Sequence, residues 1–245
     1  MKILVCITNV PDTTAKISFT DNDTKLNTAN IQFIIGPYDD YALARAVELK
    51  EQFSGKLTVL HVGGAESEPQ IRKALAIGAD DAIRVDAFPT DSYFVAEQIA
   101  AISAQNNYDL ILMGRESIDF NGGVVHGIVG ELLGIPSYSP VMKLSIENSI
   151  AQITREVDGG KETIEAPLPL VLGCQEPIAD WKIPNMRGIM TARTKPLLVV
   201  APQAVENKSS FTQFELPPAK SACKIIPADD VEQLVNLLKT EAKVI

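Results

Sequence analysis

A loop rich in glycine and asparagine stands between a strand pattern and a helix pattern in the middle of the chain. The apolar run at residues 110–113 predicts a buried strand, and residues 123–133 predict a helix that ends at Gly134 and Pro136. Between them lies the sequence Asn121-Gly122-Gly123. Because glycine has no Cβ, a phosphate can approach such a backbone closely, and the N–H groups and dipole of the following helix attract it. The loop therefore indicates an anion site, with an ordinary strand-to-helix turn as the alternative.

Nucleophiles and metal ligands are sparse in the sequence. The two histidines, His61 and His126, have no neighbouring cysteine, which argues against a zinc site, and the three cysteines form no CxxC pair that would favour an iron–sulfur cluster. Cys6 and Cys174 lie in apolar runs and are expected to be buried thiols. The sequence contains neither a P-loop motif, nor GxGxxG after the first strand, nor a GxSxG elbow. A hydrolase without such a motif stays open as a minor alternative.

The composition is that of an ordinary globular protein, with 245 residues, 46% hydrophobic and 22% charged. The net charge of −9 argues against a nucleic-acid partner, which needs a basic surface, but not against one nucleotide held by backbone amides. The longest apolar runs are shorter than a membrane span, and the first residues do not have the layout of a signal peptide. We therefore expect a cytoplasmic protein without membrane insertion.

Strand and helix patterns alternate through the first half of the chain. Buried strands are predicted at residues 2–8, 56–62, 82–85 and 110–113, and helices at about 36–50, 68–77 and 91–104. Short connections in this alternation are typical of an α/β fold with a doubly wound, mostly parallel sheet. Ligands of such sheets bind outside the carboxyl ends of the strands. Three loops at those ends, residues 9–12, 62–64 and 114–123, together with residues 36–39, favour nucleotide binding over an ordinary turn.

The second half of the chain has a different pattern. Between residues of about 140 and 166, apolar and polar side chains alternate in segments joined by hairpin turns, which predicts an antiparallel appendage. This appendage would belong to an α/β domain of residues 1–201. Residues 202–245 form a proline-containing extended arm that ends in a helix of about 229–241. The arm lies either on its own domain or on a partner, and the apolar stripe of its helix favours the partner because it needs a surface.

Six stretches then carry a family resemblance. They are ILVCITNVPDT at residues 3–13, GPYDDYALARAVELK at 36–50, IRKALAIGADDAIRV at 71–85, LILMGRESID at 110–119, REVDGGKETI at 155–164 and RGIMTARTKPL at 187–197. Through these motifs and their order the chain resembles the beta (small) subunit of electron-transfer flavoproteins over almost its whole length.

The resemblance implies a Rossmann-like domain that pairs with a larger alpha subunit. In that family the alpha subunit holds most of the redox FAD, and the beta subunit binds AMP, or a second FAD in electron-bifurcating members. Tyr38 would also lie near the alpha-subunit flavin. By position, the nucleotide contacts would be Cys6, Gly36, Pro37, Tyr38, Asp39, Val62, Asp119, Phe120, Asn121, Gly122, Gly123, Val124, Val125 and His126.

The segment of about 175–187 resembles the family's docking loop for flavin dehydrogenases of the acyl-CoA dehydrogenase type. The family's anchor is a leucine just before Pro-Asn, and Ile183 stands at that position here. Met186 and Trp181 would be its neighbours at the partner surface. Ordinary packing within the loop is the alternative for all three side chains.

Some positions depart from the family pattern. Gly36 stands where asparagine is usual, and Phe120, Asn121 and Val124 replace residues of the usual phosphate loop, with Val124 in place of a glutamine. AMP and FAD therefore both remain open as the nucleotide.

The expected function is electron carriage rather than enzymatic catalysis, because no acid, base or nucleophile is assigned and the chemistry belongs to the flavin. Electrons would pass from flavin dehydrogenases, as in fatty acid beta-oxidation, to an acceptor such as a quinone oxidoreductase. Two alternatives stay open. One is a subunit of an electron-bifurcating flavoprotein that binds a second FAD and NADH, and the other is a free-standing nucleotide-binding module of the stress-protein type.

Overall fold

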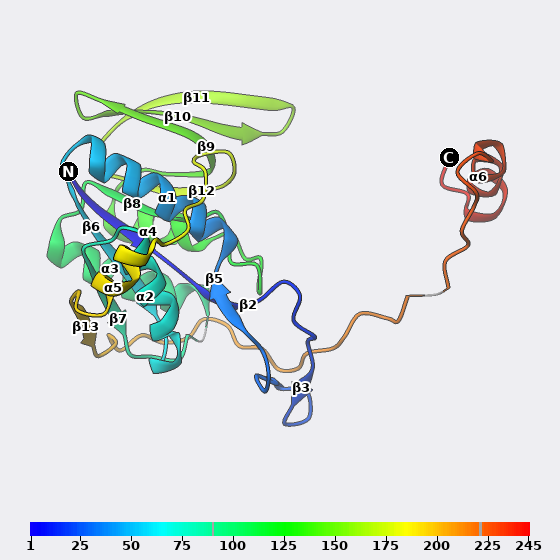
Figure 1. The fold of residues 1–245 in the computed structure, drawn as a ribbon, viewed down its shortest axis with the longest axis horizontal. Helices are drawn as coiled ribbons and strands as arrows, with labels where there is room; N and C mark the ends of the chain where they lie inside the picture. Colours follow the sequence, from blue (N-terminus) through cyan, green and yellow to red (C-terminus); the bar gives the residue numbers. More distant parts are fainter. Residues whose placement is uncertain (90, 221) are drawn as a thin grey trace. The chain divides into compact units, whose positions relative to one another are not determined.

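The structure is a computed structural model that describes residues 1–89, 91–220 and 222–245 (Figure 1). In this part of the chain a nine-stranded sheet has the order β11-β10-β9-β12-β8-β1-β6-β7-β13. Neighbours from β12 to β13 run parallel. These strands are β1 (Lys2–Cys6), β6 (Lys56–Val62), β7 (Asp81–Val85), β8 (Leu110–Gly114), β12 (Leu170–Cys174) and β13 (Leu197–Val200).

Helices cover both faces of the sheet, because side chains of the buried strands alternate between two apolar cores. Ile3 and Val5 point into a core with α1 (Pro37–Gln52), α2 (Glu68–Ile77) and α5 (Met186–Ala192). Leu4 and Cys6 point into a second core with α3 (Ser92–Asn106) and α4 (Val125–Leu133). The predicted doubly wound, mostly parallel sheet is confirmed.

The antiparallel appendage extends the same sheet. β9 (Ser137–Glu147) pairs in parallel with β12 and antiparallel with β10 (Ile150–Val157), which in turn pairs with β11 (Gly160–Pro167). Ala151 and Ile153 on β10 are fully buried, while Ile150 and Gln152 are exposed, as the alternating pattern predicts. Figure 1 shows this hairpin region at the edge of the sheet beyond β12.

The chain divides into two compact units, which are described separately. The first comprises Met1–Ile17 and Asn27–Thr212, and it also contains the pair β2 (Asn9–Pro11) and β5 (Phe33–Ile35) and the 3-10 turn Ala65–Ser67. The predicted domain boundary at residues 201 and 202 stays a prediction, and residues 203–211 lie on the first unit.

The second unit comprises Ser18–Leu26 and Gln213–Ile245. Its hairpin pairs β3 (Phe19–Thr20) with β4 (Lys25–Leu26). The ring of Phe214 stacks on Phe19 at 5.3 Å between centroids, and the Phe214 N–H donates to the Asp23 carbonyl oxygen at 2.7 Å. The unit ends in α6 (Val231–Leu237) and a π-helical turn, Leu238–Ala242, in the region where a terminal helix is predicted.

Candidate functional site

The topology places a switch point at the middle of the sheet. The chain passes from β1 outward to β6 and β7 and then returns to β8 on the opposite side of β1. At such a reversal, open α/β sheets bind their ligands outside the carboxyl ends of the two strands, which are β1 and β8 here.

A buried carboxylate holds the two sides of this switch point together. Asp39, in the first turn of α1, is 3% exposed. Its Oδ2 accepts hydrogen bonds from the N–H (2.8 Å) and the hydroxyl (2.5 Å) of Thr8, which follows β1. Its Oδ1 accepts from the N–H of Gly114, at the end of β8, at 2.7 Å. Both carboxylate oxygens are thus occupied within the protein, so this side chain ties the end of β1 to the end of β8.

The close approach around Asp39 requires glycine on both sides. A Cβ on Gly114 would lie 2.7 Å from Asp39 Oδ1, and one on Gly36 would lie 2.6 Å from Asp39 Oδ2. Burial raises the pKa of the Asp39 carboxyl to about 6, although the hydrogen bonds from Thr8 and Gly114 act to lower it. The absence of a Cβ at Gly36 thus leaves room for this bridge.

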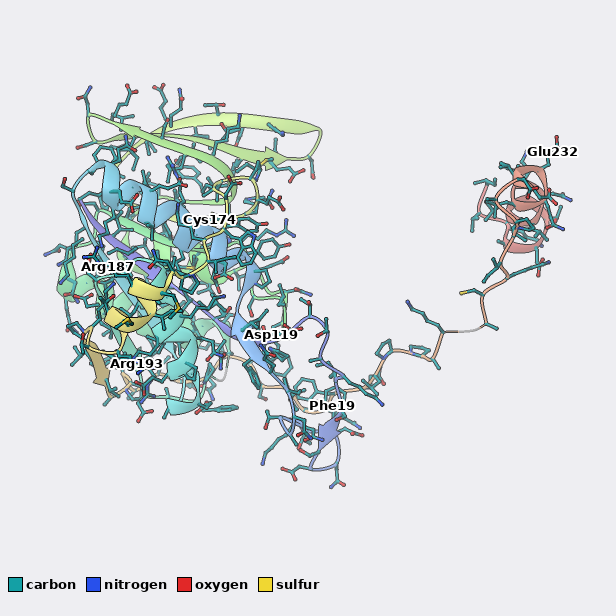
Figure 2. All side chains as sticks on the ribbon, in the orientation of Figure 1. Phe19, Asp119, Cys174, Arg187, Arg193 and Glu232 are labelled. Atoms are coloured by element: carbon teal, nitrogen blue, oxygen red, sulfur yellow. The ribbon has the colours of Figure 1, made fainter. Side chains whose placement is uncertain are left out.

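The anion loop follows β8 and begins with internal hydrogen bonds. The N–H of Asn121 donates to the Ser117 carbonyl oxygen at 2.8 Å. The Asp119 carboxylate accepts from the N–H of Phe120 at 3.0 Å and from the Ser117 hydroxyl. Figure 2 labels Asp119 in this loop. The Asp119 carboxylate is therefore already engaged in shaping the turn.

The second half of the loop presents its backbone. Asn121 and Gly123 have φ of 49° and 61°, in the left-handed region, and residues 121–124 are exposed. Among the described side chains, none caps the N-terminus of α4, which begins after Val124. The first N–H groups of a helix have no intrahelical acceptor, and the helix dipole makes that end positive. The arrangement can bind an anion through backbone N–H groups alone.

Cys6 and Val62 lie at neighbouring strand ends and are brought together in the core that faces α3 and α4. Burial raises the pKa of the Cys6 thiol, so the thiol stays protonated at neutral pH. His126, in the first turn of α4, is half-buried, and its Nδ1 lies 3.4 Å from the Ser137 hydroxyl. Burial has the opposite effect on His126 and lowers its pKa, which favours the neutral imidazole.

A polar network that leaves no pattern in the sequence connects the end of β8 to the start of the predicted docking loop. The guanidinium of Arg115 lies 5.0 Å from the centroid of the Tyr38 ring, and its Nη1 donates to Gln175 Oε1 at 2.8 Å. Gln175, which follows β12, donates through Nε2 to Glu156 Oε2 at 2.9 Å. Arg115 and Gln175 each follow directly after a strand, and the order of β8 and β12 in the sheet makes them neighbours.

The predicted docking residues lie on a separate surface. Trp181 is 54% exposed, and Ile183 and Met186 are each 74% exposed. We call these three side chains and Met190 of α5, which is 69% exposed, the apolar patch. Figure 2 places Arg187 of α5 well apart from Asp119. The loop site and the apolar patch are therefore two distinct features of one domain.

Hydrogen bonds at both ends of α5 hold the helix that carries Met186 and Met190 of the apolar patch. Arg72 of α2 donates through Nη1 to the carbonyl oxygens of Ala192 (3.0 Å) and Lys195 (2.8 Å), which fixes the end of α5. The Asn185 side chain caps α5 by accepting from the N–H of Gly188 at 2.8 Å. Helix α5 begins within the segment that we expect to be a loop, and a seven-residue helix containing a glycine gives too short a pattern to predict.

The described residues give two further negative findings. None of their helices combines the length and the apolar character that a membrane crossing requires. Nor do they contain a group of three or more His, Cys, Asp or Glu side chains arranged to hold a metal ion.

The fold and the loop geometry define a doubly wound α/β protein with an anion-type loop at its switch point. Residues 23–205 match the electron transfer flavoprotein domain. The chain is 35% identical to the electron transfer flavoprotein subunit beta of Bacillus subtilis (strain 168), with all of both chains covered. It is 36% identical to that of Syntrophomonas wolfei over 99% of each chain, and 29% identical to the mitochondrial protein of Arabidopsis thaliana over all of both. The chain belongs to the electron transfer flavoprotein family, and the predicted resemblance is confirmed.

Proposed function

We propose that this chain is the beta subunit of a heterodimeric electron transfer flavoprotein. The full-length similarity to proteins named as beta subunits carries this proposal. The subunit would pair with an alpha subunit that holds most of the FAD, and would pass electrons from flavin dehydrogenases to an acceptor such as a quinone oxidoreductase. The flavin supplies the redox chemistry, while this chain contributes binding and orientation.

The loop before α4 would hold the phosphate of a nucleotide, AMP in the simplest case. An exposed, glycine-containing backbone, at a helix that no described side chain caps, fits a phosphate group. Cys6, Val62 and residues 36–39 would contact the rest of the nucleotide. Val124 has no polar side chain that could contact the nucleotide and so does not favour AMP or a second FAD. Chemical analysis of the released ligand distinguishes the two. A ligand that binds only the folded state would also stabilise the subunit.

Co-expression with the alpha subunit from the same source tests this assignment. We expect a stable 1:1 heterodimer that releases one FAD and one AMP when it is denatured and its ligands are quantified by chromatography. Two FAD per heterodimer would instead support the electron-bifurcating alternative, in which this chain binds a second FAD and NADH. A homodimer that does not bind the alpha subunit would overturn the proposal and favour a free-standing nucleotide-binding module of the stress-protein type.

The apolar patch would dock flavin dehydrogenases, with Ile183 as the anchor. An exposed branched side chain gains affinity by filling a desolvated pocket on a partner, and loss of such an anchor typically costs 2 kcal/mol or more, roughly thirtyfold. Ile183→Ala is therefore expected to slow reduction of the heterodimer by an acyl-CoA dehydrogenase while its flavin content stays the same. Ile150→Ala, at an exposed isoleucine of β10 (42% exposed), is the matched control. Equal rates for the two variants would exclude Ile183 as the anchor.

A further inference from the structure

Residues 203–211, which we call the strap, are fastened to the domain where they leave β13. The side chain of Gln98 in α3 is 2% exposed and bonds to the Gln203 backbone in both directions. Its Nε2 donates to the Gln203 carbonyl oxygen at 3.1 Å, and its Oε1 accepts from the Gln203 N–H at 2.7 Å. A buried amide that is satisfied in this way fixes one point of the strap.

A second attachment lies at the N-terminus of α3. Asp91 caps that helix with Oδ1, which accepts from the N–H of Phe94 at 2.6 Å. Its Oδ2 accepts from the N–H groups of Lys208 (2.6 Å) and Ser209 (2.8 Å) of the strap. Burial acts to raise the pKa of Asp91, but these N–H donors outweigh it and lower the pKa, so the carboxylate is ionised at neutral pH. One carboxylate thus serves both helix and strap.

The strap then reaches the anion loop. The ring of Phe211 stacks on the ring of Phe120, with centroids 4.8 Å apart and planes 28° apart. Phe120 stands directly before Asn121, and a Cβ on Gly122 would lie 3.5 Å from the hydroxyl oxygen of Ser92 in α3. The loop is therefore bordered by the start of α3 on one side and by an aromatic contact from the strap on another.

We propose that the strap is a positioning element of the nucleotide loop and that Phe211 sets how tightly the loop binds a nucleoside phosphate. This inference rests on the proposed nucleotide function. A loop with exposed backbone and two left-handed residues must be ordered before its N–H groups can converge on a phosphate, and that ordering costs affinity. The stack on Phe120, supported by the two attachments of the strap, meets part of this cost in advance. A stacked aromatic pair of this kind corresponds to about a three- to tenfold effect.

The test uses the full chain in complex with its alpha subunit, freed of nucleotide, with AMP affinity measured by calorimetry. Phe211→Leu removes the stacked ring and is expected to weaken AMP binding three- to tenfold. Phe211→Tyr keeps the ring and should bind like the wild type. Asp91→Asn is a second route to the same result, because its remaining oxygen can cap α3 but no longer accepts from the strap. Thr212→Ala, next to Phe211, is the control for a change in this segment.

A second readout follows the loop itself. Without nucleotide, backbone hydrogen exchange at residues 119–125 should be faster in Phe211→Leu than in Phe211→Tyr. Wild-type affinity together with wild-type exchange in Phe211→Leu would overturn the positioning role and leave nucleotide binding intact. A wild-type heterodimer that binds no AMP or other adenine nucleotide would overturn the proposed nucleotide function and this inference with it.

Discussion

Two neighbouring helices begin in opposite ways. Helix α3 starts after Asp91, whose carboxylate accepts from its first turn and from the strap, whereas α4 starts after Val124 and has no side-chain cap among the described residues. In both helices the first N–H groups have no acceptor within the helix, and the dipole makes that end positive. In α3 the protein supplies the anion itself, and this stabilises the fold. In α4 the first N–H groups have no side-chain acceptor among the described residues, so they can donate to a bound ligand instead.

Giving α4 a carboxylate of its own should abolish this difference. Val124→Asp places a negative charge where we expect the phosphate, and two charges at about 4 Å near a protein surface repel by about 4 kcal/mol, roughly a thousandfold in affinity. Calorimetry with AMP on the heterodimer measures the loss. Val124→Thr, which has the same shape without charge, should bind nearly normally. If both variants bind equally well, the phosphate does not lie at α4.

Asp39 extends the comparison to α1, where a carboxylate is buried at a helix start. Its pKa is raised from 3.8 to about 6 in the folded protein, so the folded state binds the proton more tightly than the unfolded state. The stability that this group contributes is complete below pH 3.8 and is lost as the pH rises through 6. At about 1.4 kcal/mol per pKa unit, the loss is on the order of 3 kcal/mol.

Denaturant unfolding of Asp39→Asn and wild type between pH 4 and 7 measures this loss. The variant does not titrate at this position, so its stability should improve relative to the wild type as the pH rises. His61, whose pKa is lowered by burial, titrates in both proteins and cancels in the difference. A difference that stays constant with pH would mean that Asp39 does not titrate in this range.

How far these features could be foreseen depends on the kind of pattern that each leaves in the sequence. The parallel strands and the hairpins have side chains that alternate or run apolar over several residues, so they were predicted. The glycines and the asparagine of the loop before α4 are also recognisable in the sequence as a turn that leaves the backbone accessible. Asp39 was expected as a nucleotide contact, but its carboxylate is bonded to Gly114, 75 residues away, and this pairing follows only from the sheet order.

The strap left no such signal. Its attachments use the backbone of Gln203, Lys208 and Ser209, which carries no side-chain pattern, while Gln98 and Asp91 look like ordinary polar residues of a helix. The proline-containing arm was therefore predicted as one extended segment, although its first part lies on the domain.

Removing the cap of α3 should weaken the fold more than the equivalent change at α4. Asp91→Ala deletes the acceptor for Phe94 and for the strap, and loss of an N-cap typically costs about 1–2 kcal/mol of unfolding free energy. Val124→Ala deletes no cap and should change stability by less than about 0.5 kcal/mol. Urea titration of both variants gives the comparison, and equal midpoints would show that the Asp91 bonds add little.

The smallest expected effect is a difference in unfolding free energy between alanine substitutions at two glycines near the start of α4. Gly123 has φ of 61°, so an alanine there is strained by about 1 kcal/mol. Gly127 lies inside α4 with no atom within 4 Å of a Cβ among the described residues, so an alanine there should stabilise the helix by about 0.5–1 kcal/mol. The two substitutions are chemically identical and four residues apart, and urea titration should give changes of opposite sign. A stabilising Gly123→Ala would mean that the loop does not keep its left-handed backbone in solution, and the approach of a phosphate to that backbone would then lose its structural basis.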